Sequence, residues 1–341
     1  MIEETVFTKE EIIDVLKKIY NIDVYQVVKL NRGSANLYSL NEDNYILKEF
    51  QTKYTKEEIE KEITIINHLK NDGIPVPEYI QTLDGEYSFV YKNRVVIIQK
   101  YINGYTIESN TANYTQMLES AEYLGKIVKS LESLEIDLPS NDVSNWYSME
   151  TIDESIEKQK ELLKKISIEN YSQIYKDLSD KISMLEYVRD NLDFSDMDKL
   201  TVMNTHGDYS VLQFIYKDGK IEAIIDFVSA CKMPVVWEII RSYSYIDPKA
   251  KEGKIEINNL IQYVKKFTGF VCLNKYDFKY MSYLYLVQLL ASTFGYKQYI
   301  ADNSKTSLLE FAFFRTSLCK YLFENAEKIA NILMEELLNN N

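Results

Sequence analysis

The amino-acid sequence predicts an α+β protein with two lobes. Short apolar runs separated by turn residues fill residues 1–100 and predict a small antiparallel sheet. Longer stretches with apolar residues at helical spacing dominate residues 101–341 and predict a larger, mainly helical lobe. The chain has 341 residues, 46% of them hydrophobic, which is enough for two domains at roughly 150 residues each. We therefore expect an N-terminal lobe up to residue 100 and a C-terminal lobe from residue 101.

The N-terminal lobe is predicted to begin with an amphipathic helix over residues 5–20. The runs "VYQVVKL", "NLYSL" and "YILKEF" follow, and the turn residues between them predict an antiparallel meander. The stretch "TKEEIEKEITIINHLKNDG" predicts a second helix that ends at Gly73, and "YSFVY" and "RVVIIQKYI" predict two more strands. With its turn at "NEDN", the meander should place Lys48 opposite Leu37.

The C-terminal lobe is predicted to be helical on both sides of one hairpin. The hairpin consists of "VLQFIY" and "IEAIIDF" around "KDGK", because Asp-Gly favours a two-residue turn. Pairing outward from this turn places Asp226 opposite Val211, three residues from Asp208, with Gln213 along the same strand. The helical patterns cover residues 112–135, 150–191, 235–245, 255–267, 275–299 and 305–338.

Composition excludes several classes of protein. The N-terminus has no signal-peptide pattern, and the longest uncharged apolar run is too short and too polar for a membrane span. Three widely separated cysteines suit a reducing compartment, so we expect a soluble, cytoplasmic protein that does not bind membranes. The net charge of −13 disfavours binding to nucleic acid, and two histidines with three scattered cysteines leave no zinc cluster.

The hairpin brings oxygen-bearing side chains to one open end. Asp208, Gln213 and Asp226 supply two carboxylates and an amide, which suit Mg²⁺, a hard ion usually held by few side chains and by phosphates. The alternative is an Asp-capped turn with coincidental acids.

The N-terminal lobe offers residues for binding phosphate. Gly33 lies at a turn between strands, where the ammonium of Lys48 would reach a phosphate under the loop. Glu62 lies fourteen residues after Lys48, on a helix face, and a lysine–glutamate pair of this type positions the lysine in kinases. Taken separately, both charges are more often surface residues.

Taken together and in this order, these residues resemble the aminoglycoside phosphotransferase/choline kinase family, which has the protein-kinase-like fold of two lobes. The resemblance covers almost the whole chain. Beside the turn at Gly33 and Lys48 in "YILKEF", it runs through "EITIINHLKNDGIPVP", "IIQKYINGYTI", "HGDYSVLQ", "IIDF" and "PVVWEIIR".

The resemblance implies an ATP-dependent (or GTP-dependent) kinase that phosphorylates a hydroxyl group of a small molecule. Asp208 matches the catalytic aspartate that accepts the proton of the hydroxyl, and Gln213 and Asp226 match the two Mg²⁺ ligands. His206 matches the histidine that braces the catalytic loop. The residues implied to bind the nucleotide are Gly33, Ser34, Ala35, Lys48, Glu62, Gln99, Lys100 and Tyr101.

Two positions depart from the pattern of the family. Gln213 stands where the family usually has asparagine, which either still ligates the metal or marks a loss of phosphoryl transfer. Glu238 stands where the family generally has aspartate, and we expect it to support the loop without reacting.

The function therefore has a leading interpretation and two alternatives. The alternatives are a non-catalytic protein with the kinase fold, such as a spore-coat-type protein, and a protein kinase. The acceptor of the leading interpretation is aminoglycoside-like, choline-like or another metabolite. The acidic residues of 150–198 would suit a cationic acceptor, although a run of charge is usually only a solvated face.

Overall fold

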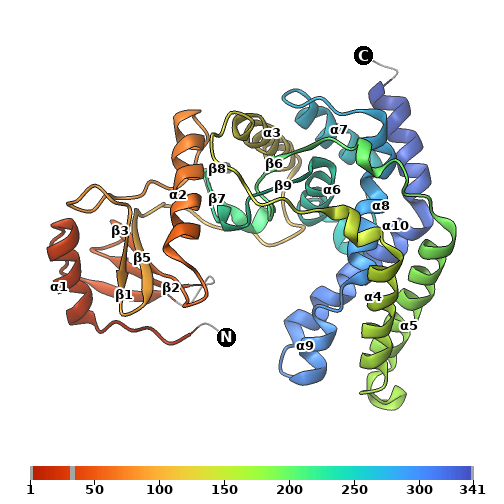
Figure 1. The fold of residues 1–341 in the computed structure, drawn as a ribbon, viewed down its shortest axis with the longest axis horizontal. Coiled ribbons are helices and arrows are strands. Elements are labelled where there is room, and N and C mark those ends of the chain that lie inside the picture. Colours follow the sequence, from red (N-terminus) through yellow and green to blue (C-terminus); the bar gives the residue numbers. More distant parts are fainter. Residues whose placement is uncertain (1–2, 31–34, 339–341) are drawn as a thin grey trace. The chain divides into compact units, whose positions relative to one another are not determined.

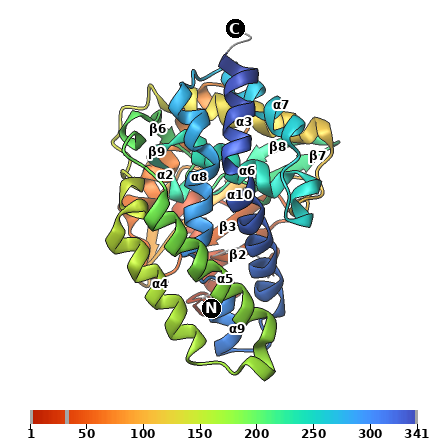
Figure 2. The same ribbon diagram turned by 90° about the vertical axis from the view of Figure 1, so that its right-hand side faces the viewer.

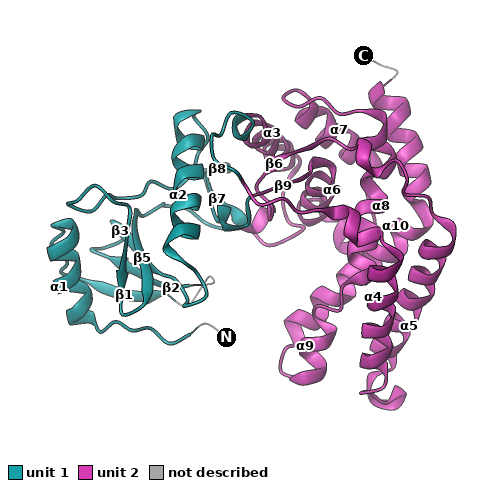
Figure 3. Ribbon diagram, viewed as in Figure 1, with its two compact units in different colours: residues 1–106, 130–137, 213–230 teal, residues 107–129, 138–212, 231–341 magenta. Residues whose placement is uncertain are grey.

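The computed structural model describes residues 3–30 and 35–338, which form two compact units (Figure 3). Unit 1 comprises residues 1–106, 130–137 and 213–230. Unit 2 comprises residues 107–129, 138–212 and 231–341. The functional division at residue 100, into a nucleotide-binding lobe and a catalytic lobe, stays a prediction.

Unit 1 contains an antiparallel five-stranded sheet in the order β1-β2-β3-β5-β4 (Figure 1). Leu37 pairs with Lys48 across β2 and β3, which confirms the register predicted from the "NEDN" turn. The five strands are β1 (Val27–Leu30), β2 (Asn36–Leu40), β3 (Tyr45–Glu49), β4 (Ser88–Tyr91) and β5 (Arg94–Lys100).

Helices α1 and α2 of unit 1 both begin at a capping box. Helix α1 (Lys9–Tyr20) starts later than predicted, because the Thr8 side chain accepts from the backbone N–H of Glu11 while the Glu11 carboxylate accepts from that of Thr8. Helix α2 (Lys56–Asn71) has the same arrangement at its own N-terminus. Gly73, with φ of 77°, follows α2 where the sequence predicted its end.

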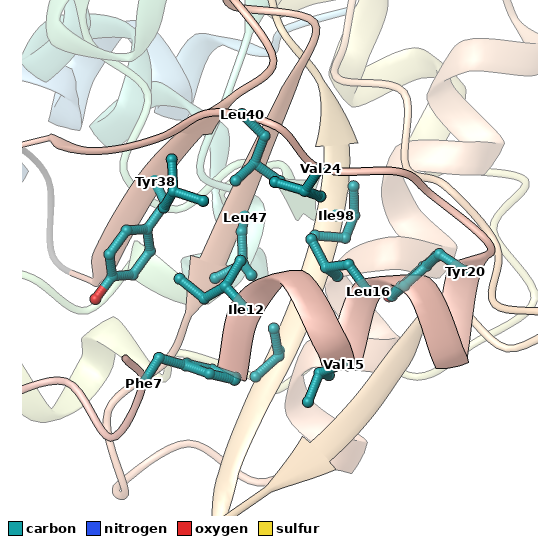
Figure 4. Close-up of a cluster of buried hydrophobic side chains, with 12 residues drawn as sticks. Phe7, Ile12, Val15, Leu16, Tyr20, Val24, Tyr38, Leu40, Leu47 and Ile98 are labelled. Carbon is teal, nitrogen blue, oxygen red and sulfur yellow. The ribbon is translucent and has the colours of Figure 1, made fainter. Parts of the chain in front are cut away.

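The core of unit 1 lies between α1 and the sheet (Figure 4). Ile12 and Leu16 of α1 are fully buried in one cluster with Leu40, Leu47 and Ile98 from three strands. These residues face one another because the apolar positions of α1 recur at helical spacing while successive side chains of a strand point to opposite faces of the sheet.

The hairpin of unit 1 consists of β7 (Phe214–Lys217) and β8 (Lys220–Ile224) around the predicted turn. The predicted pairing of Asp226 with Val211 is wrong. The register shifts between Ile215 and Tyr216, and the ladder ends where Phe214 pairs with Ile224. Before that point the chain forms the short 3₁₀ helix η3 (Val211–Gln213), so no strand exists at Val211.

The hairpin is tied to the segment that follows β5. Tyr105 and Tyr216 exchange two backbone hydrogen bonds, with N···O distances of 2.8 and 2.7 Å. A Cβ atom on Gly104 would lie 2.6 Å from the carbonyl oxygen of Tyr216, so this approach requires glycine. The backbone N–H of Ile224 also donates to Pro75 O at 2.9 Å, which anchors the second strand.

Unit 2 is mainly helical, as predicted, and Figure 2 shows α10 running alongside α8 and α4 alongside α5. The helices predicted over residues 150–191 and 275–299 are each broken into two. The second break lies at residues 292–295, where Gly295 has a φ of 91°. The helices are α3 (Tyr114–Leu131, its last residues in unit 1), α4 (Met149–Leu163), α5 (Ile168–Asn191), α6 (Val235–Ile246), α7 (Ile257–Thr268), α8 (Lys275–Ala291), α9 (Tyr296–Ala301) and α10 (Thr306–Leu338).

The sequence did not predict the small sheet of unit 2, which pairs β6 (Val202–Thr205) with β9 (Cys231–Pro234). Each strand has only four residues, too few for a clear alternation of apolar and polar positions. The remaining short 3₁₀ helices are η1 (Val143–Tyr147), η2 (Met197–Lys199), η4 (Phe227–Ser229) and η5 (Pro248–Glu252). Across residues 3–30 and 35–338, no helix is both long and apolar enough to span a bilayer.

The core of unit 1 leads to a prediction with a matched control on the same helix. Ile12→Ala should lower the free energy of unfolding by about 2–5 kcal/mol, because Ile12 is fully buried and the substitution leaves a cavity. Its neighbour Ile13 is 40% exposed, and Ile13→Ala should cost much less. Urea denaturation followed by circular dichroism measures both, and equal losses would contradict this assignment of the buried face.

A second prediction concerns Lys181 of α5, a lysine that is 3% exposed and whose ammonium donates to Ser292 O. Burial lowers the pKa of Lys181 from 10.5 to about 8. Between pH 8 and 10 the unfolded chain therefore holds a proton that the folded chain has lost, so stability contributed by this group rises with pH. Each pKa unit corresponds to about 1.4 kcal/mol, so the full gain is on the order of 3 kcal/mol.

The measurement is the difference in unfolding free energy between the wild type and Lys181→Met, from pH 7 to 10. Tyrosines and other groups that titrate in this range cancel in the difference. The difference should be flat below pH 8 and should then move in favour of the wild type. Parallel pH profiles of the two proteins would refute the prediction.

Candidate active site

The "HGD" loop of unit 2 follows β6, which pairs with β9 through Thr205 and Cys231. Gly207 has a φ of 80°, a conformation that favours glycine, and it turns the chain sharply before Asp208. His206 is fully buried, and its Nδ1 accepts a hydrogen bond from the backbone N–H of Asp208 at 3.3 Å. Its ring also meets that of Tyr209 edge to face, with centroids 5.7 Å apart. His206 thus braces the loop, as the sequence predicted.

Glu238 holds the backbone of the same loop from the first turn of α6. The side chain is fully buried, and its Oε1 accepts from the backbone N–H of Tyr209 at 2.8 Å. Its Oε2 accepts from the hydroxyl of Thr205, so both oxygens have donors on the two sides of Asp208. The expectation that this acid supports the loop is confirmed.

Arg241 reaches the side chain of Asp208 from the next turn of α6. Its Nη2 donates to Asp208 Oδ1, and its Nη1 donates to the carbonyl oxygen of Tyr209 at 3.1 Å. The side chain of Asp208 is 40% exposed and that of Arg241 only 16%, so the carboxylate keeps access to solvent. Sequence reasoning missed Arg241, although its spacing of three residues from Glu238 places both on one face of a helix.

The two predicted metal ligands, Gln213 and Asp226, both belong to unit 1. The backbone N–H of Ile225 donates to the carbonyl oxygen of Gln213 at 3.0 Å, which brings Gln213 and Asp226 to the same open end of the hairpin. Asp226 has a φ of 69° and a ψ of 59°, a left-handed conformation that costs energy in any residue but glycine.

An amide oxygen and a carboxylate at one end of a hairpin fit a hard cation such as Mg²⁺. Within the described part of the chain, no group of three or more His, Cys, Asp or Glu side chains is arranged to hold a metal. Phosphate oxygens and water would therefore supply the other ligands, as they usually do for Mg²⁺.

Lys48 and Glu62 both lie in unit 1, and their predicted ion pair stays a prediction. The ammonium of Lys48 lies 4.6 Å from the centroid of the Phe50 ring, and Glu62 is 2% exposed. Burial raises the pKa of the Tyr79 phenol well above its usual range, and the carboxylates of Glu62 and Asp226 raise it further. Glu62 and Asp226 therefore both lie near the Tyr79 phenol.

The residues implied to contact the rest of the nucleotide also lie in unit 1. Gly33 and Ser34 fall outside the described residues, and Ala35 is buried immediately before β2. The backbone N–H groups of the residues after Gln99 are already engaged. That of Lys100 donates to Glu78 O at 2.8 Å, and that of Tyr101 donates to Asn44 O at 3.0 Å.

The acidic segment 150–198 shows paired charges. Arg189 donates to Asp153 at 2.7 Å and to Asp190 at 2.8 Å, and Lys320 lies 2.8 Å from both Asp177 and Asp180. Basic side chains therefore compensate these acids, at the surface for the Arg189 pairs and against the buried carboxylate of Asp177 for Lys320.

Comparison with known proteins identifies the family. The model of the phosphotransferase enzyme family matches residues 26–256, which is more than half of the chain and includes the loop, the hairpin, Lys48 and Glu62. The chain belongs to this family. The resemblance predicted from the sequence motifs is therefore confirmed.

One curated relative and two solved structures illustrate the relationship. A homoserine kinase from Zymomonas mobilis is 23% identical over 203 residues, which span 59% of this chain but only 58% of that kinase. The structure of spectinomycin phosphotransferase APH(9)-Ia, with ADP and spectinomycin, has a TM-score of 0.63 at 17% identity and covers 95% of this chain and all of its own.

The second structure is that of the amicoumacin kinase hAmiN in complex with AMP-PNP and Ca²⁺. It has a TM-score of 0.62 at 15% identity and covers 92% of this chain and 94% of its own. At these identities the likeness concerns the fold, and it confirms the predicted α+β, protein-kinase-like fold class.

The contacts of Glu238 lead to a prediction on stability. Glu238→Ala would leave the buried N–H of Tyr209 and the hydroxyl of Thr205 without this acceptor, which should lower the free energy of unfolding by about 1–3 kcal/mol for each donor. Glu222→Ala removes an exposed glutamate and should change it by no more than about 0.5 kcal/mol. Chemical denaturation compares them, and a neutral Glu238→Ala would contradict the role of this acid.

Proposed function

We propose that this protein is an ATP-dependent (or GTP-dependent) phosphotransferase that moves the γ-phosphoryl group to a hydroxyl of a small molecule. The observation that carries the proposal is the exposure of the Asp208 side chain and the support of its loop. Asp208 is a partly exposed carboxylate on a loop whose backbone a buried glutamate holds, in a chain of the phosphotransferase family. The nucleotides in the structures of the amicoumacin kinase and the spectinomycin phosphotransferase support the choice of phosphate donor.

In this proposal each functional group has one task. Asp208 orients the acceptor hydroxyl and accepts its proton as a new bond forms between the hydroxyl oxygen and the γ-phosphorus. The bond from that phosphorus to the bridging oxygen breaks, and ADP leaves with the electron pair. Lys48 contacts the α- and β-phosphates, with Glu62 as its partner. A Mg²⁺ ion held by Gln213 and Asp226 would offset the charge of the phosphates.

Adenine would bind at the end of β5, but through partly different backbone groups from those that the sequence predicted. The sequence predicted backbone groups of Gln99, Lys100 and Tyr101, but two of their N–H groups are occupied by Glu78 O and Asn44 O. We therefore expect the carbonyl oxygens of this segment to accept from adenine, and the N–H of Ile102 or Asn103 to donate to it. Gly33, Ser34 and Ala35 would cover the phosphates.

The acceptor is a small molecule with a hydroxyl group. Aminoglycosides, choline, homoserine, spectinomycin and amicoumacin form a rational panel, because the first two follow from the family resemblance and the others are named for the relatives. The paired acids of residues 150–198 favour no particular charge, so the panel needs both cationic and neutral acceptors.

Gln213 is the observation that favours a second candidate, a non-catalytic protein with this fold and a structural or binding role. Its amide is one methylene further from the backbone than that of asparagine. The two candidates differ in one assay: Asp208→Asn abolishes phosphoryl transfer in an enzyme, whereas it leaves a binding protein unchanged.

The proposal predicts that ATP binding depends on Mg²⁺ and on Asp226. Asp226→Asn removes the negative charge while asparagine still tolerates the left-handed conformation, so the fold should persist and Mg²⁺-dependent affinity should fall about tenfold or more. Asp218→Asn is the matched control, because Asp218 also has a positive φ, of 50°, and lies at the far end of the same hairpin.

Isothermal titration of ATP with and without Mg²⁺ measures this, followed by ADP release across the acceptor panel. Asp218→Asn should bind like the wild type. Absence of Mg²⁺-dependent nucleotide binding in the wild type would overturn the proposal. Binding without transfer to any acceptor or to water, unchanged in Asp208→Asn, would support the non-catalytic candidate.

A further inference from the structure

The guanidinium group of Arg241 contacts two aromatic rings of its own helix. The guanidinium carbon lies 5.4 Å from the ring centroid of Trp237 and 5.1 Å from that of Tyr245, residues that flank Arg241 on α6 at spacings of four. Both rings are nearly buried, at 7% and 6% exposure. Contacts of a guanidinium with aromatic faces fix the plane of the group as well as its position.

The two rings are themselves fixed by further aromatic contacts within unit 2. Trp237 meets Trp146 edge to face, with centroids 5.8 Å apart, and Tyr245 stacks on Phe311 of α10, with centroids 6.0 Å apart and planes 10° from parallel. Movement of Arg241 would therefore disturb a packed row of rings, so its side chain has little freedom.

The guanidinium group fixed in this way donates two hydrogen bonds to the loop. One nitrogen donates to Asp208 Oδ1 and the other to the carbonyl oxygen of Tyr209, so the fork engages both the side chain of Asp208 and the backbone next to it. An exposed ion pair contributes little to stability. Arg241 differs from such a pair in its second hydrogen bond to the loop and in its contacts with two aromatic rings.

We propose that Arg241 is a positioning residue for phosphoryl transfer: its clamped guanidinium fixes the carboxylate of Asp208 in the orientation that receives the acceptor hydroxyl. This inference rests on the proposed function of Asp208. Positioning of a reacting group within a fraction of an ångström is worth orders of magnitude in rate, so loss of the clamp affects turnover more than nucleotide binding.

Lysine cannot replace Arg241 in this role. It carries the same charge, but a single ammonium has no planar fork to span the Asp208 carboxylate and the Tyr209 carbonyl, and it stacks poorly between two rings. Arg241→Lys therefore separates geometry from charge. Arg189→Lys is the matched control, because Arg189 also binds aspartates but lies on the charged surface of α5.

The experiment measures ADP release from Mg-ATP, with water or an acceptor from the panel, in the wild type and these variants. Arg241→Lys should lower kcat by at least about tenfold, with KM for ATP within about twofold of the wild type. Arg189→Lys should leave both unchanged. Circular dichroism and urea denaturation establish that each variant is folded.

Chemical rescue provides a readout that a purely structural role would not give. Guanidinium chloride, well below denaturing concentration, should partly restore turnover to Arg241→Ala, whereas urea, a neutral molecule of similar shape, should not. The double variant with Asp208→Asn should show no rescue.

The outcomes separate the two proposals. A wild type without turnover under every condition overturns the proposed function and this inference with it. A wild type that turns over while Arg241→Lys keeps its kcat overturns the inference alone. If Arg241→Ala does not fold, the split between kcat and KM in Arg241→Lys decides the question.

Discussion

The organisation of the candidate site depends on one buried carboxylate, that of Glu238. Its two oxygens accept from Thr205 and Tyr209, which flank the "HGD" loop, so the loop backbone is fixed from the first turn of α6. A buried acid with two donors is stable where an unpaired one would not be. Arg241 extends from the same helix, and α6 thereby fixes both the backbone around Asp208 and its side chain.

In unit 1, backbone hydrogen bonds and not a buried charge hold the segment around Asp226. Asp226 adopts a left-handed conformation two residues after β8, next to backbone hydrogen bonds that fix the hairpin. The N–H of Ile224 bonds to Pro75 O, that of Ile225 bonds to Gln213 O, and Tyr216 is paired with Tyr105. The position of Asp226, which we propose as a metal ligand, is thus set by backbone hydrogen bonds on both strands of the hairpin.

Sequence patterns determined most of the fold but not the detail of the site. The register of Leu37 with Lys48 was predictable because a short turn fixes strand pairing. The pairing of Asp226 was not, because one irregularity between Ile215 and Tyr216 shifts every later pair and no residue type marks it. Arg241 was missed because its role comes from a contact 33 residues away in sequence, which local periodicity does not encode.

The two departures from the family pattern are of the same kind, because Gln213 and Glu238 each carry one methylene more than the usual residue. For Glu238 the outcome is visible, since both oxygens still reach donors on the loop. Gln213 ends a 3₁₀ helix where a strand was predicted, and its backbone carbonyl accepts from the N–H of Ile225. Glutamine keeps the amide oxygen of the usual asparagine, so the substitution alone is a weak argument against catalysis.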